Sequence, residues 1–375
     1  GTEFEFYGFV EGDDITKGTV DVVDLSGHVK VLTPHLASVQ GTGWSRNDDE
    51  IWFTAADTTI LRSLRAVTLS GRQRTLLSSP TPLHLQYIAA DGRVLLTTES
   101  NRINLDLFTA GRPQPRSMNV LDWSYGSAMT PDGQQLVIGD QDAGVNYSTY
   151  LRKTDGSPPV RLGDGTPVAS SPDGQWVVSV VPNTLQLWLL PTGTGEPRQL
   201  TKGAIRFASF KGAWSAEGPS VLALGDEPGR PARMWRVSLA GAVQPLTPEG
   251  IMGSVLTPDG KALLAAAQGT GQFAAYPLGG GAPRPVPGLE NGDRPLAYAA
   301  DGRGLFVAHA QGSLEDEVLR IDTTTGGRIH MYTVLPDNSA GVAGVRVRGI
   351  SADGKSYLVS YEQDLFALYL VRGVR

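Results

Sequence analysis

Side chains that could carry out catalysis are few and scattered in this sequence. The chain has no cysteine, which excludes thiolate nucleophiles, thiolate metal sites and disulfides. No two of its five histidines stand at the spacing of a metal-binding pair, and the sequence His-Glu-x-x-His is absent. The histidines are His28, His35, His84, His309 and His330. These residue types therefore predict neither a thiol enzyme nor a metalloenzyme of that kind.

A serine nucleophile on a sharp turn would need the pattern Gly-x-Ser-x-Gly. The two nearest matches, residues 43–47 (GWSRN) and 213–217 (AWSAE), both lack the final glycine. Each also stands where a strand reaches its turn, so that Trp-Ser is explained as the end of a strand. We expect no catalytic residue in this chain, and hence no enzyme.

Aspartates recur in the pattern Asp-Gly before an apolar run, at Asp91, Asp132, Asp173, Asp259, Asp301 and Asp353. A ring of carboxylates could bind cations. However, Asp-Gly combines a side-chain acceptor with a residue that tolerates positive φ, which is what a tight hairpin requires. We therefore assign these aspartates to turns and not to a functional site.

The Asp-Gly turns define a repeat of about forty residues, and each copy carries four short apolar or alternating segments. In the copy around Asp173, strands are expected at residues 168–171, 177–180, 185–190 and 198–200. A period of this length made of short strands is typical of a β-propeller with one blade per repeat. The predicted fold class is all-β: a β-propeller of four-stranded antiparallel blades.

Both ends of the chain carry strands outside the complete repeats. Three strands are expected at 4–10, 19–25 and 29–32, and the last repeat supplies 345–350, 357–361 and 365–371. We expect N- and C-terminal strands to combine in one closing blade, because this removes an open sheet edge. The result is a single domain over residues 1–375 with eight blades, or seven if the degenerate repeat near Glu217 or the terminal strands are accessory. The chain begins at Gly1, which favours an excised or processed part of a larger protein.

Composition excludes several classes of partner. The net charge is −6, and no basic stripe occurs, which disfavours nucleic acid and anionic membranes. No apolar run approaches the 18 residues or so of a membrane span. We expect a protein or peptide partner.

Strand order places the loops between second and third strands on one face of the disc, together with the loops that lead to the next repeat. Many of these loops are acidic, including residues 99–102, 139–142, 225–227, 315–317 and 362–364. We hypothesise an acidic upper face around the central mouth, suited to a basic peptide or to a hydrated cation such as Ca²⁺. The alternative is that an acidic protein simply carries its solvated charge in loops.

The residues expected to bind a partner lie in these loops and at the entrance to one inner strand. Trp123 precedes an inner strand and could anchor a peptide or a sugar, although burial between blades explains it better. The loop from Gly139 to Tyr147 and the last repeat interval are both longer than their counterparts, and functional residues are often added at such places. The candidates are Trp123, Asp140, Asp142, Asn146, Tyr147, Asp226, Glu227, Arg230, Glu315 and Asp316.

The turn and the strand that follows it resemble the repeat of TolB-type, WD-like bacterial propellers over nearly the whole chain. Residues 150–163 (YLRKTDGSPPVRLG), 188–200 (WLLPTGTGEPRQL) and 225–230 (GDEPGR) further resemble the propeller region attached to Ser/Thr protein kinases of acidobacteria and related soil bacteria. This resemblance implies a sensor or scaffold fused to a kinase and a membrane segment, in a periplasmic or other extracytoplasmic location. The chain itself contains no kinase motif.

The sequence therefore favours a non-enzymatic recognition or sensor propeller that binds a protein or peptide and belongs to a bacterial signalling protein. No cofactor is expected, except for the possible Ca²⁺. The alternative is a lactonase-like or lyase-like propeller enzyme with a central divalent metal. Against it, the residues before the turns are small or apolar: Ala89, Ala128, Ala169, Val255 and Ala299. A purely structural hub is the third hypothesis.

Overall fold

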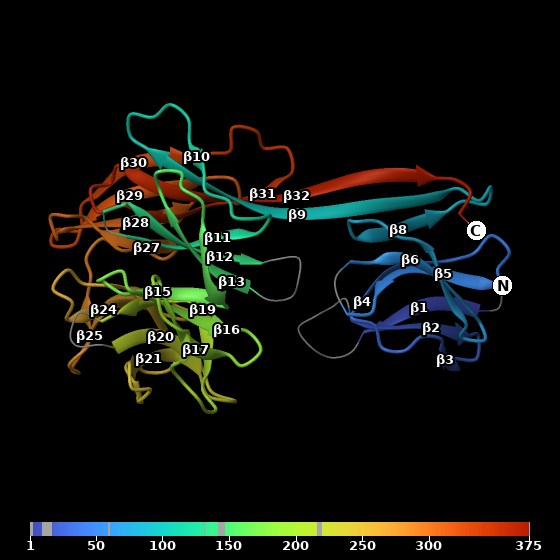
Figure 1. Cartoon of the computed structure of the whole chain (residues 1–375), viewed down its shortest axis with the longest axis horizontal. Coiled ribbons are helices and arrows are strands. Elements are labelled where there is room, and N and C mark those ends of the chain that lie inside the picture. Colours follow the sequence, from blue (N-terminus) through green and yellow to red (C-terminus); the bar gives the residue numbers. More distant parts are fainter. Residues whose placement is uncertain are drawn as a thin grey trace. The chain divides into compact units, whose positions relative to one another are not determined.

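The computed structural model describes residues 3–9, 17–58, 61–130, 132–141, 147–215 and 220–374, and every regular element in these ranges is a β-strand (Figure 1). The strands form sheets that are mostly four-stranded, which confirms the predicted all-β propeller architecture. They group into two compact units, a first unit of Gly1–Asn101 with Asp364–Arg375 and a second unit of Arg102–Gln363. The described residues contain no helix long and apolar enough to cross a membrane.

Five sheets of the second unit each contain four strands that follow one another in the chain. The first sheet consists of β11 (Ser124–Met129), β12 (Gln135–Gln141), β13 (Tyr147–Lys153) and β14 (Val160–Asp164). The second consists of β15 (Thr166–Ser170), β16 (Trp176–Val181), β17 (Gln186–Pro191) and β18 (Arg198–Gln199). The third consists of β19 (Arg206–Trp214), β20 (Ser220–Asp226), β21 (Arg233–Ser238) and β22 (Val243–Pro245). The other two are β23 (Ile251–Leu256), β24 (Ala262–Ala267), β25 (Phe273–Pro277) and β26 (Arg284–Pro285); and β27 (Asp293–Tyr298), β28 (Gly304–Ala310), β29 (Asp316–Asp322) and β30 (Arg328–Val334).

A further sheet takes its strands from two distant parts of the chain. Its order is β31 (Val342–Ile350), β32 (Ser356–Val371), β9 (Val94–Thr109) and β10 (Arg116–Ser117). The amide of Ala110 donates to the carbonyl of Lys355 at 2.8 Å, and Asn104 bonds to Gln363 at 2.7 Å. Residue numbers therefore rise along β9 as they fall along β32, so the two strands run antiparallel.

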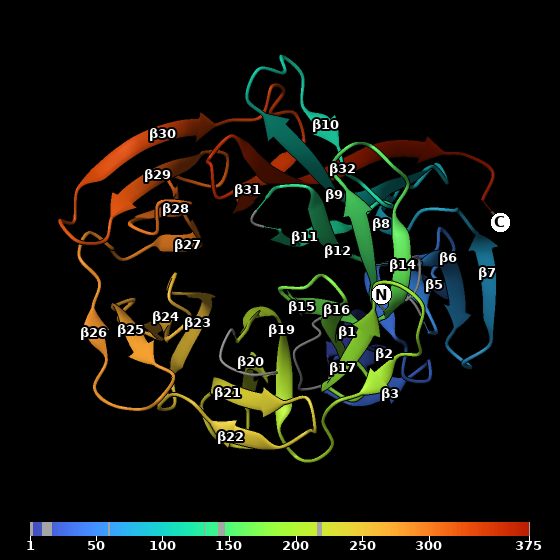
Figure 2. The same ribbon diagram turned by 60° about the vertical axis from the view of Figure 1, so that its left-hand side comes forward.

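The first strands of these six sheets surround the centre of the second unit (Figure 2). β11 contacts β15, and contacts continue in order through β19, β23, β27 and β31, which in turn contacts β11. The ring is therefore closed within the second unit, and β11, β15, β19, β23, β27 and β31 are its inner strands.

The Asp-Gly turns form as the repeat predicts. In the turn at Asp173, the Oδ1 atom accepts hydrogen bonds from the Ser171 hydroxyl at 2.5 Å and from the Gln175 amide at 3.0 Å. Gly174 follows with a φ of +69°, a conformation that costs an L side chain energy. The hydrogen bond from Ser171 is the main reason why the pKa of Asp173 lies below its ordinary value. These carboxylates are thus used within their own turns.

The first unit contains the N-terminal strands and one complete four-stranded sheet. β1 (Glu3–Phe9), β2 (Gly18–Asp24) and β3 (Val29–Val31) form a three-stranded sheet. β4 (Ser38–Trp44), β5 (Glu50–Ala56), β6 (Ser63–Thr68) and β7 (Gln73–Leu77) form the complete one, and β8 (Leu83–Ile88) pairs with the beginning of β9.

The closing arrangement expected from the sequence is wrong. β1 pairs along its whole length with β2, its neighbour in the chain, whereas β32 pairs with β9 and β31. A ladder to a chain neighbour closes a short loop, which costs less entropy than pairing with the other terminus. The described residues form eight sheets, and six of these sheets form the closed ring of the second unit. The expectation of eight or seven blades in one ring stays a prediction. The expectation of a single domain over residues 1–375 also stays a prediction.

Two expected hairpins are also absent. Residues 99–102 and 362–364, expected as loops between second and third strands, instead lie inside β9 and β32. Neither segment contains glycine or proline, and no residue in either has a positive φ. Two-residue hairpins need positive φ at one or both central positions, which glycine adopts most readily, so these segments favour a turn less strongly than the Asp-Gly turns do.

Apolar side chains from neighbouring sheets hold the ring together. Between the sheets of β15 and β19, Val178, Leu187 and Phe207 are at most 2% exposed and belong to one cluster. Burying a side chain of this size stabilises the fold by about 1.5–3 kcal/mol relative to exposure. The second strands of these sheets, such as β16 and β20, are buried over most of their length and form the core between neighbouring sheets.

Candidate functional site

Two aromatic residues lie where β11 begins, at the end of the second unit's ring that we call the ring mouth: the end at which the inner strands start. Trp123 directly precedes β11, and Tyr125 lies on it; both side chains are half-buried. Their ring centroids are 6.2 Å apart at an interplanar angle of 76°, an edge-on contact. Burial raises the pKa of Tyr125, although Arg348 acts in the opposite direction, so the phenol keeps its proton at neutral pH.

Arg348 on β31 adds a cation to these rings. Its guanidinium carbon lies 5.3 Å from the centre of the Tyr125 ring, and its Nε donates to Ser360 Oγ at 2.7 Å. Among the described residues, its Nη1 and Nη2 make no hydrogen bond. The residue is exposed, yet desolvation by surrounding protein lowers its pKa. Because a guanidinium keeps its proton at neutral pH, Arg348 stays charged there.

Asp316, one of the predicted binding residues, is fully buried at the start of β29. Its Oδ2 atom accepts hydrogen bonds from the guanidinium of Arg294 and from the amide of Val347, the latter at 2.7 Å. Its Oδ1 atom is buried and has no hydrogen-bond partner among the described residues. A buried polar atom left unpaired costs free energy, so a donor from water or from a ligand would be favourable at this oxygen. Asp316 thereby joins β27, β29 and β31 beside Arg348.

Asp140 and Tyr147, also predicted, come from the second and third strands of the β11 sheet. The fully buried Asp140 accepts hydrogen bonds from the Ser124 hydroxyl at 2.5 Å and from the Leu121 amide at 3.0 Å. Burial raises the pKa of Tyr147, and nearby Tyr125 and Asp140 raise it further. Asp140 therefore fixes the segment that carries Trp123, and Tyr147 adds a third aromatic ring to the ring mouth.

Three other predicted residues take part in surface ion pairs. Asp226 accepts a hydrogen bond from Arg206 Nε at 3.0 Å. Glu227 pairs with Arg230 at 3.3 Å, and Arg230 also pairs with Glu249 at 2.5 Å. Arginines thus neutralise these acids, so these positions do not support the hypothesis of an acidic upper face.

The remaining predicted residues do not join the cluster. Glu315 precedes β29, where its carbonyl accepts from the Gln311 amide at 3.1 Å. Asp142 and Asn146 lie outside the described residues. The structure therefore brings together four of the predicted residues: Trp123, Asp140, Tyr147 and Asp316.

Sequence reasoning missed Tyr125, Arg294 and Arg348. A signal was present in β31, where buried Val345 and Val347 alternate with Arg346 and Arg348. On a strand with one buried face, this alternation places both arginines on the other face. The search for acidic loops overlooked cations on the inner strands themselves.

A second polar cavity, of about 290 Å³, lies beside the composite sheet. Asp106 of β9, Tyr361 of β32 and Asp337 of the long loop after β30 line it, and this loop accounts for the longer last repeat interval. Burial, followed by the charge of Asp337, raises the pKa of Asp106. Burial is also the main cause of the raised pKa of Tyr361. Two facing carboxylates make this cavity a place for positive charge.

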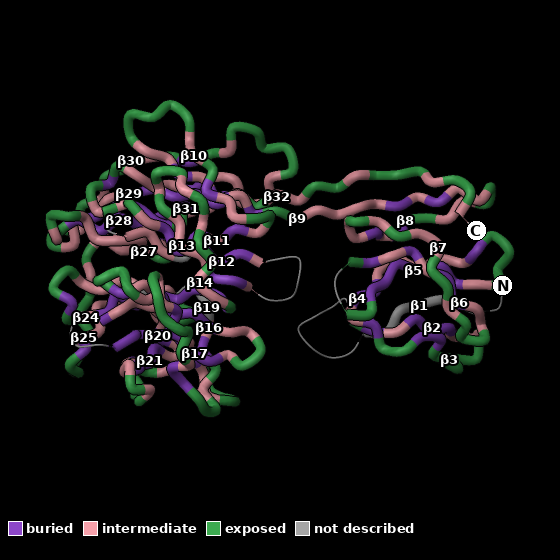
Figure 3. The backbone as a smooth tube through the Cα atoms, in the orientation of Figure 1, coloured by how far each residue is buried: buried purple, intermediate pink, exposed green. Residues whose placement is uncertain are grey.

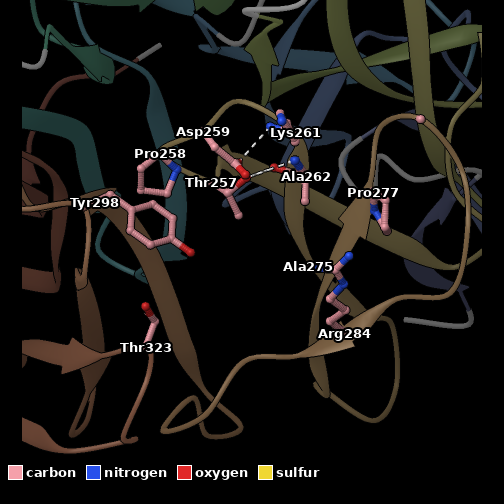
Figure 4. Close-up of a pocket in the computed structure, with 12 residues that line it drawn as sticks. Thr257, Pro258, Asp259, Lys261, Ala262, Ala275, Pro277, Arg284, Tyr298 and Thr323 are labelled. Carbon is pink, nitrogen blue, oxygen red and sulfur yellow. Dashed lines mark hydrogen bonds between the residues drawn. The ribbon is translucent and has the colours of Figure 1, made fainter.

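Another cavity, of about 620 Å³, lies between the β23 and β27 sheets at the turn end of the ring (Figure 4). Its polar lining includes Asp259, Lys261, Arg284, Tyr298 and Thr323. Asp259 is engaged in its own turn, since it accepts from the Thr257 hydroxyl at 2.7 Å and from the Lys261 amide at 3.0 Å. The carboxylate of Asp259 is therefore used within its own turn.

In the part of the chain that the structure describes, no group of three or more His, Cys, Asp or Glu side chains is placed to hold a metal ion. A Ca²⁺ or other divalent ion would need oxygen ligands that converge. At the ring mouth, Asp140 and Asp316 already bind Ser124 and Arg294.

No protein-family model matches the chain, and no curated protein matches its sequence. Among solved structures, TolB from Acinetobacter baumannii is 14% identical over 95% of this chain and 63% of its own, with a TM-score of 0.32. A puromycin-hydrolyzing peptidase from Mycobacterium tuberculosis is 16% identical over 82% of this chain and 55% of its own, with a TM-score of 0.45. A GH74 enzyme from Niastella koreensis is 11% identical over 93% of this chain and 64% of its own, with a TM-score of 0.43. The chain thus spans less than two thirds of each, and the similarity is one of fold.

Proposed function

We propose that the chain is a non-enzymatic recognition propeller that binds a protein or peptide segment at the ring mouth. The observation that carries this proposal is the cluster of Trp123, Tyr125, Tyr147 and Arg348, in which Arg348 lies 5.3 Å from the Tyr125 ring. Trp, Tyr and Arg are the residues that most often dominate the binding energy of protein interfaces. A signalling role, fusion to a kinase and a membrane segment, and an extracytoplasmic location complete the proposal and rest on the sequence resemblance alone.

The charge of the site selects the kind of segment. Arg294 is paired with Asp316, whereas the described partners of Arg348 are a hydroxyl and an aromatic ring. A guanidinium with two available terminal nitrogens binds a carboxylate through two parallel hydrogen bonds. The ligand is therefore a peptide that presents an Asp, a Glu or a C-terminal carboxylate next to an apolar side chain, in place of the basic peptide expected from the sequence.

The test is binding of the purified chain to matched peptide pools that carry either acidic side chains or their amide counterparts. Acidic peptides should bind, and Arg348→Ala should weaken their binding about tenfold or more, as expected for a charge-assisted hydrogen-bonded contact. Arg348→Lys keeps the charge but loses the paired geometry and should give an intermediate loss. Arg112→Ala, at an exposed arginine of the same unit, is the matched control.

Binding that prefers amide or basic peptides, or that Arg348→Ala leaves unchanged, would refute this assignment. The same samples with added Ca²⁺ test the lactonase-like or lyase-like alternative. A rise in melting temperature with Ca²⁺, lost on chelation, would favour a bound metal, because a ligand of the native state stabilises it by mass action.

A further inference from the structure

Two strands, β9 and β32, are each sixteen residues long and belong to one five-stranded sheet, together with β8, β10 and β31. The beginning of β9 pairs with β8, as in Leu83 opposite Thr98, and its end pairs with β10, as in Leu107 opposite Arg116. The four-stranded sheets, by contrast, are each built from four successive strands. β9 and β32 therefore differ in kind from the other strands.

Each long strand corresponds to the second and third strands of one repeat, joined end to end. Residues 94–99 follow the Asp91-Gly92 turn, as second strands do, and residues 103–109 precede β10, as third strands do. In the same way, residues 356–362 pair with β31, and residues 365–371 continue the strand. In the other repeats these two strands fold back on each other, as β5 and β6 do.

The third strands of these two repeats are consequently exchanged. In the second unit, residues 103–109 occupy the third position beside residues 356–362, and in the first unit residues 365–371 occupy it beside residues 94–99. The exchanged segments have related patterns, since INLDLFT and LFALYLV both place leucines two residues apart. Exchange of equivalent elements preserves the sheet pairings and changes chiefly the hinges, so the two arrangements are close in energy.

The exchanged segments are not equally buried where they lie. Ile103, Leu105 and Leu107 are at most 5% exposed. In contrast, Phe366 is 64% exposed, Leu368 66% and Leu370 53%, and Figure 3 shows this end of β32 largely as exposed. The uncharged run from Leu365 to Val371 thus gains little burial from its present position, which favours an alternative place for it.

We propose that β9 and β32 exchange between the open form described here and a closed form in which each strand folds back on itself, at residues 99–102 and 362–364. Closing replaces the hydrogen bonds of Asn101 with Asp364 and of Asn104 with Gln363 by hairpins within each repeat. Asn101 can supply the positive φ of such a turn, because asparagine tolerates the left-handed conformation. The closed form is the strand pairing that the sequence repeats predict.

The exchange also controls the smaller polar cavity. Asn104, Asp106 and Phe108 from β9 line it together with Tyr361 and Gln363 from β32. When β9 folds back on itself, these two walls separate. The cavity is therefore a property of the open form, and a cation held between Asp106 and Asp337 would favour that form.

The absence of cysteine allows a direct test with introduced pairs. Thr109→Cys with Ser356→Cys reports the open form, in which the two hydroxyls are 3.3 Å apart. Thr97→Cys with Asn104→Cys reports the closed form, because residues seven apart in one extended strand are about 23 Å apart, while a disulfide needs Cα atoms within about 7 Å. Ala55→Cys with Ser63→Cys, which face each other across β5 and β6, is the positive control.

We expect both reporter pairs to form disulfides within monomers, separated by size after mild oxidation. Adding Ser100→Asn with Asn101→Gly, which favours a two-residue hairpin, should raise the yield of the closed disulfide several-fold over the same pair without it. If the closed pair stays reduced in monomers with and without this turn, or forms only in dimers, exchange within one chain is refuted. If the open pair stays reduced while the control pair oxidises, the open form is not populated, and the proposal is likewise wrong.

Discussion

At the turn end of the second unit's ring, Asp173 accepts hydrogen bonds within its own turn, whereas Asp316 at the ring mouth accepts them from strands far away in the sequence. Asp173 uses Ser171 and Gln175, two residues away on either side. Asp316 uses Arg294 and Val347, 22 and 31 residues away. The same side chain therefore has a local role that repeats and a long-range role that does not. The repeated aspartates belong to the turns of the scaffold, and the aspartate that departs from this pattern lies at the proposed binding site.

The largest expected effect of a single change at an aspartate concerns the long-range role. Asp316→Ala removes the acceptor of two hydrogen bonds and leaves Arg294 without its counter-charge, while Asp316→Asn keeps one acceptor. Since hydrogen bonds to charged groups are worth more than neutral ones, we expect Asp316→Ala to lower the free energy of unfolding by about 2–3 kcal/mol. Urea unfolding measures this change. A loss no larger than that from Asp173→Ala would erase the contrast between the two ends.

The loss of stability at low pH should also differ between the two ends of the ring, and at the ring mouth we expect it to depend on Asp293. Burial raises the pKa of Asp293, but two hydrogen bonds from Arg328, one from the Glu290 amide and one from His309 outweigh burial and leave the pKa below its ordinary value. A carboxyl group whose pKa is lower in the folded state than in the unfolded state stabilises the folded protein at pH values above its unfolded pKa of about 3.9. This contribution is lost as the pH falls through the folded value.

Asp293→Asn should therefore reduce the stability of the chain at neutral pH and make the remaining stability fall less steeply on acidification. Urea midpoints measured between about pH 6 and about pH 3 test this expectation. Asp132→Asn, whose pKa is also lowered but chiefly by the Thr130 hydroxyl at an exposed turn, is the matched control. An equal change in slope for both variants would mean that burial at the mouth adds nothing.

The smallest expected effect concerns the turns themselves. Gly174 has a φ of +69°, and a Cβ atom added there would meet no other atom within 4 Å. Gly174→Ala therefore reports the backbone conformation alone and should cost about 1 kcal/mol in the free energy of unfolding. Unchanged stability would show that this turn can adopt a different conformation without cost.

The sequence was sufficient for the parts of the molecule that depend on neighbouring residues. Turns such as Asp173-Gly174 combine their own acceptor with their own positive φ, so the repeat and its strands could be predicted. The pair of Arg294 with Asp316 could not, because it depends on how two sheets meet. Likewise, no local sequence pattern shows whether β32 pairs with β1, as expected, or with β9, as observed.

The composite sheet gives the order of synthesis a role in folding. The end of β9 precedes the beginning of β32 by about 250 residues. At a synthesis rate of about 5–20 residues per second, β9 waits roughly 12–50 s before β32 exists. A hairpin forms within about 1–10 μs, so during this interval the only third strand available to the beginning of β9 is its own continuation. In a newly made chain, the two halves of β9 can therefore pair with each other first, as in the closed form. The pairing of β9 with β32 must then replace this hairpin.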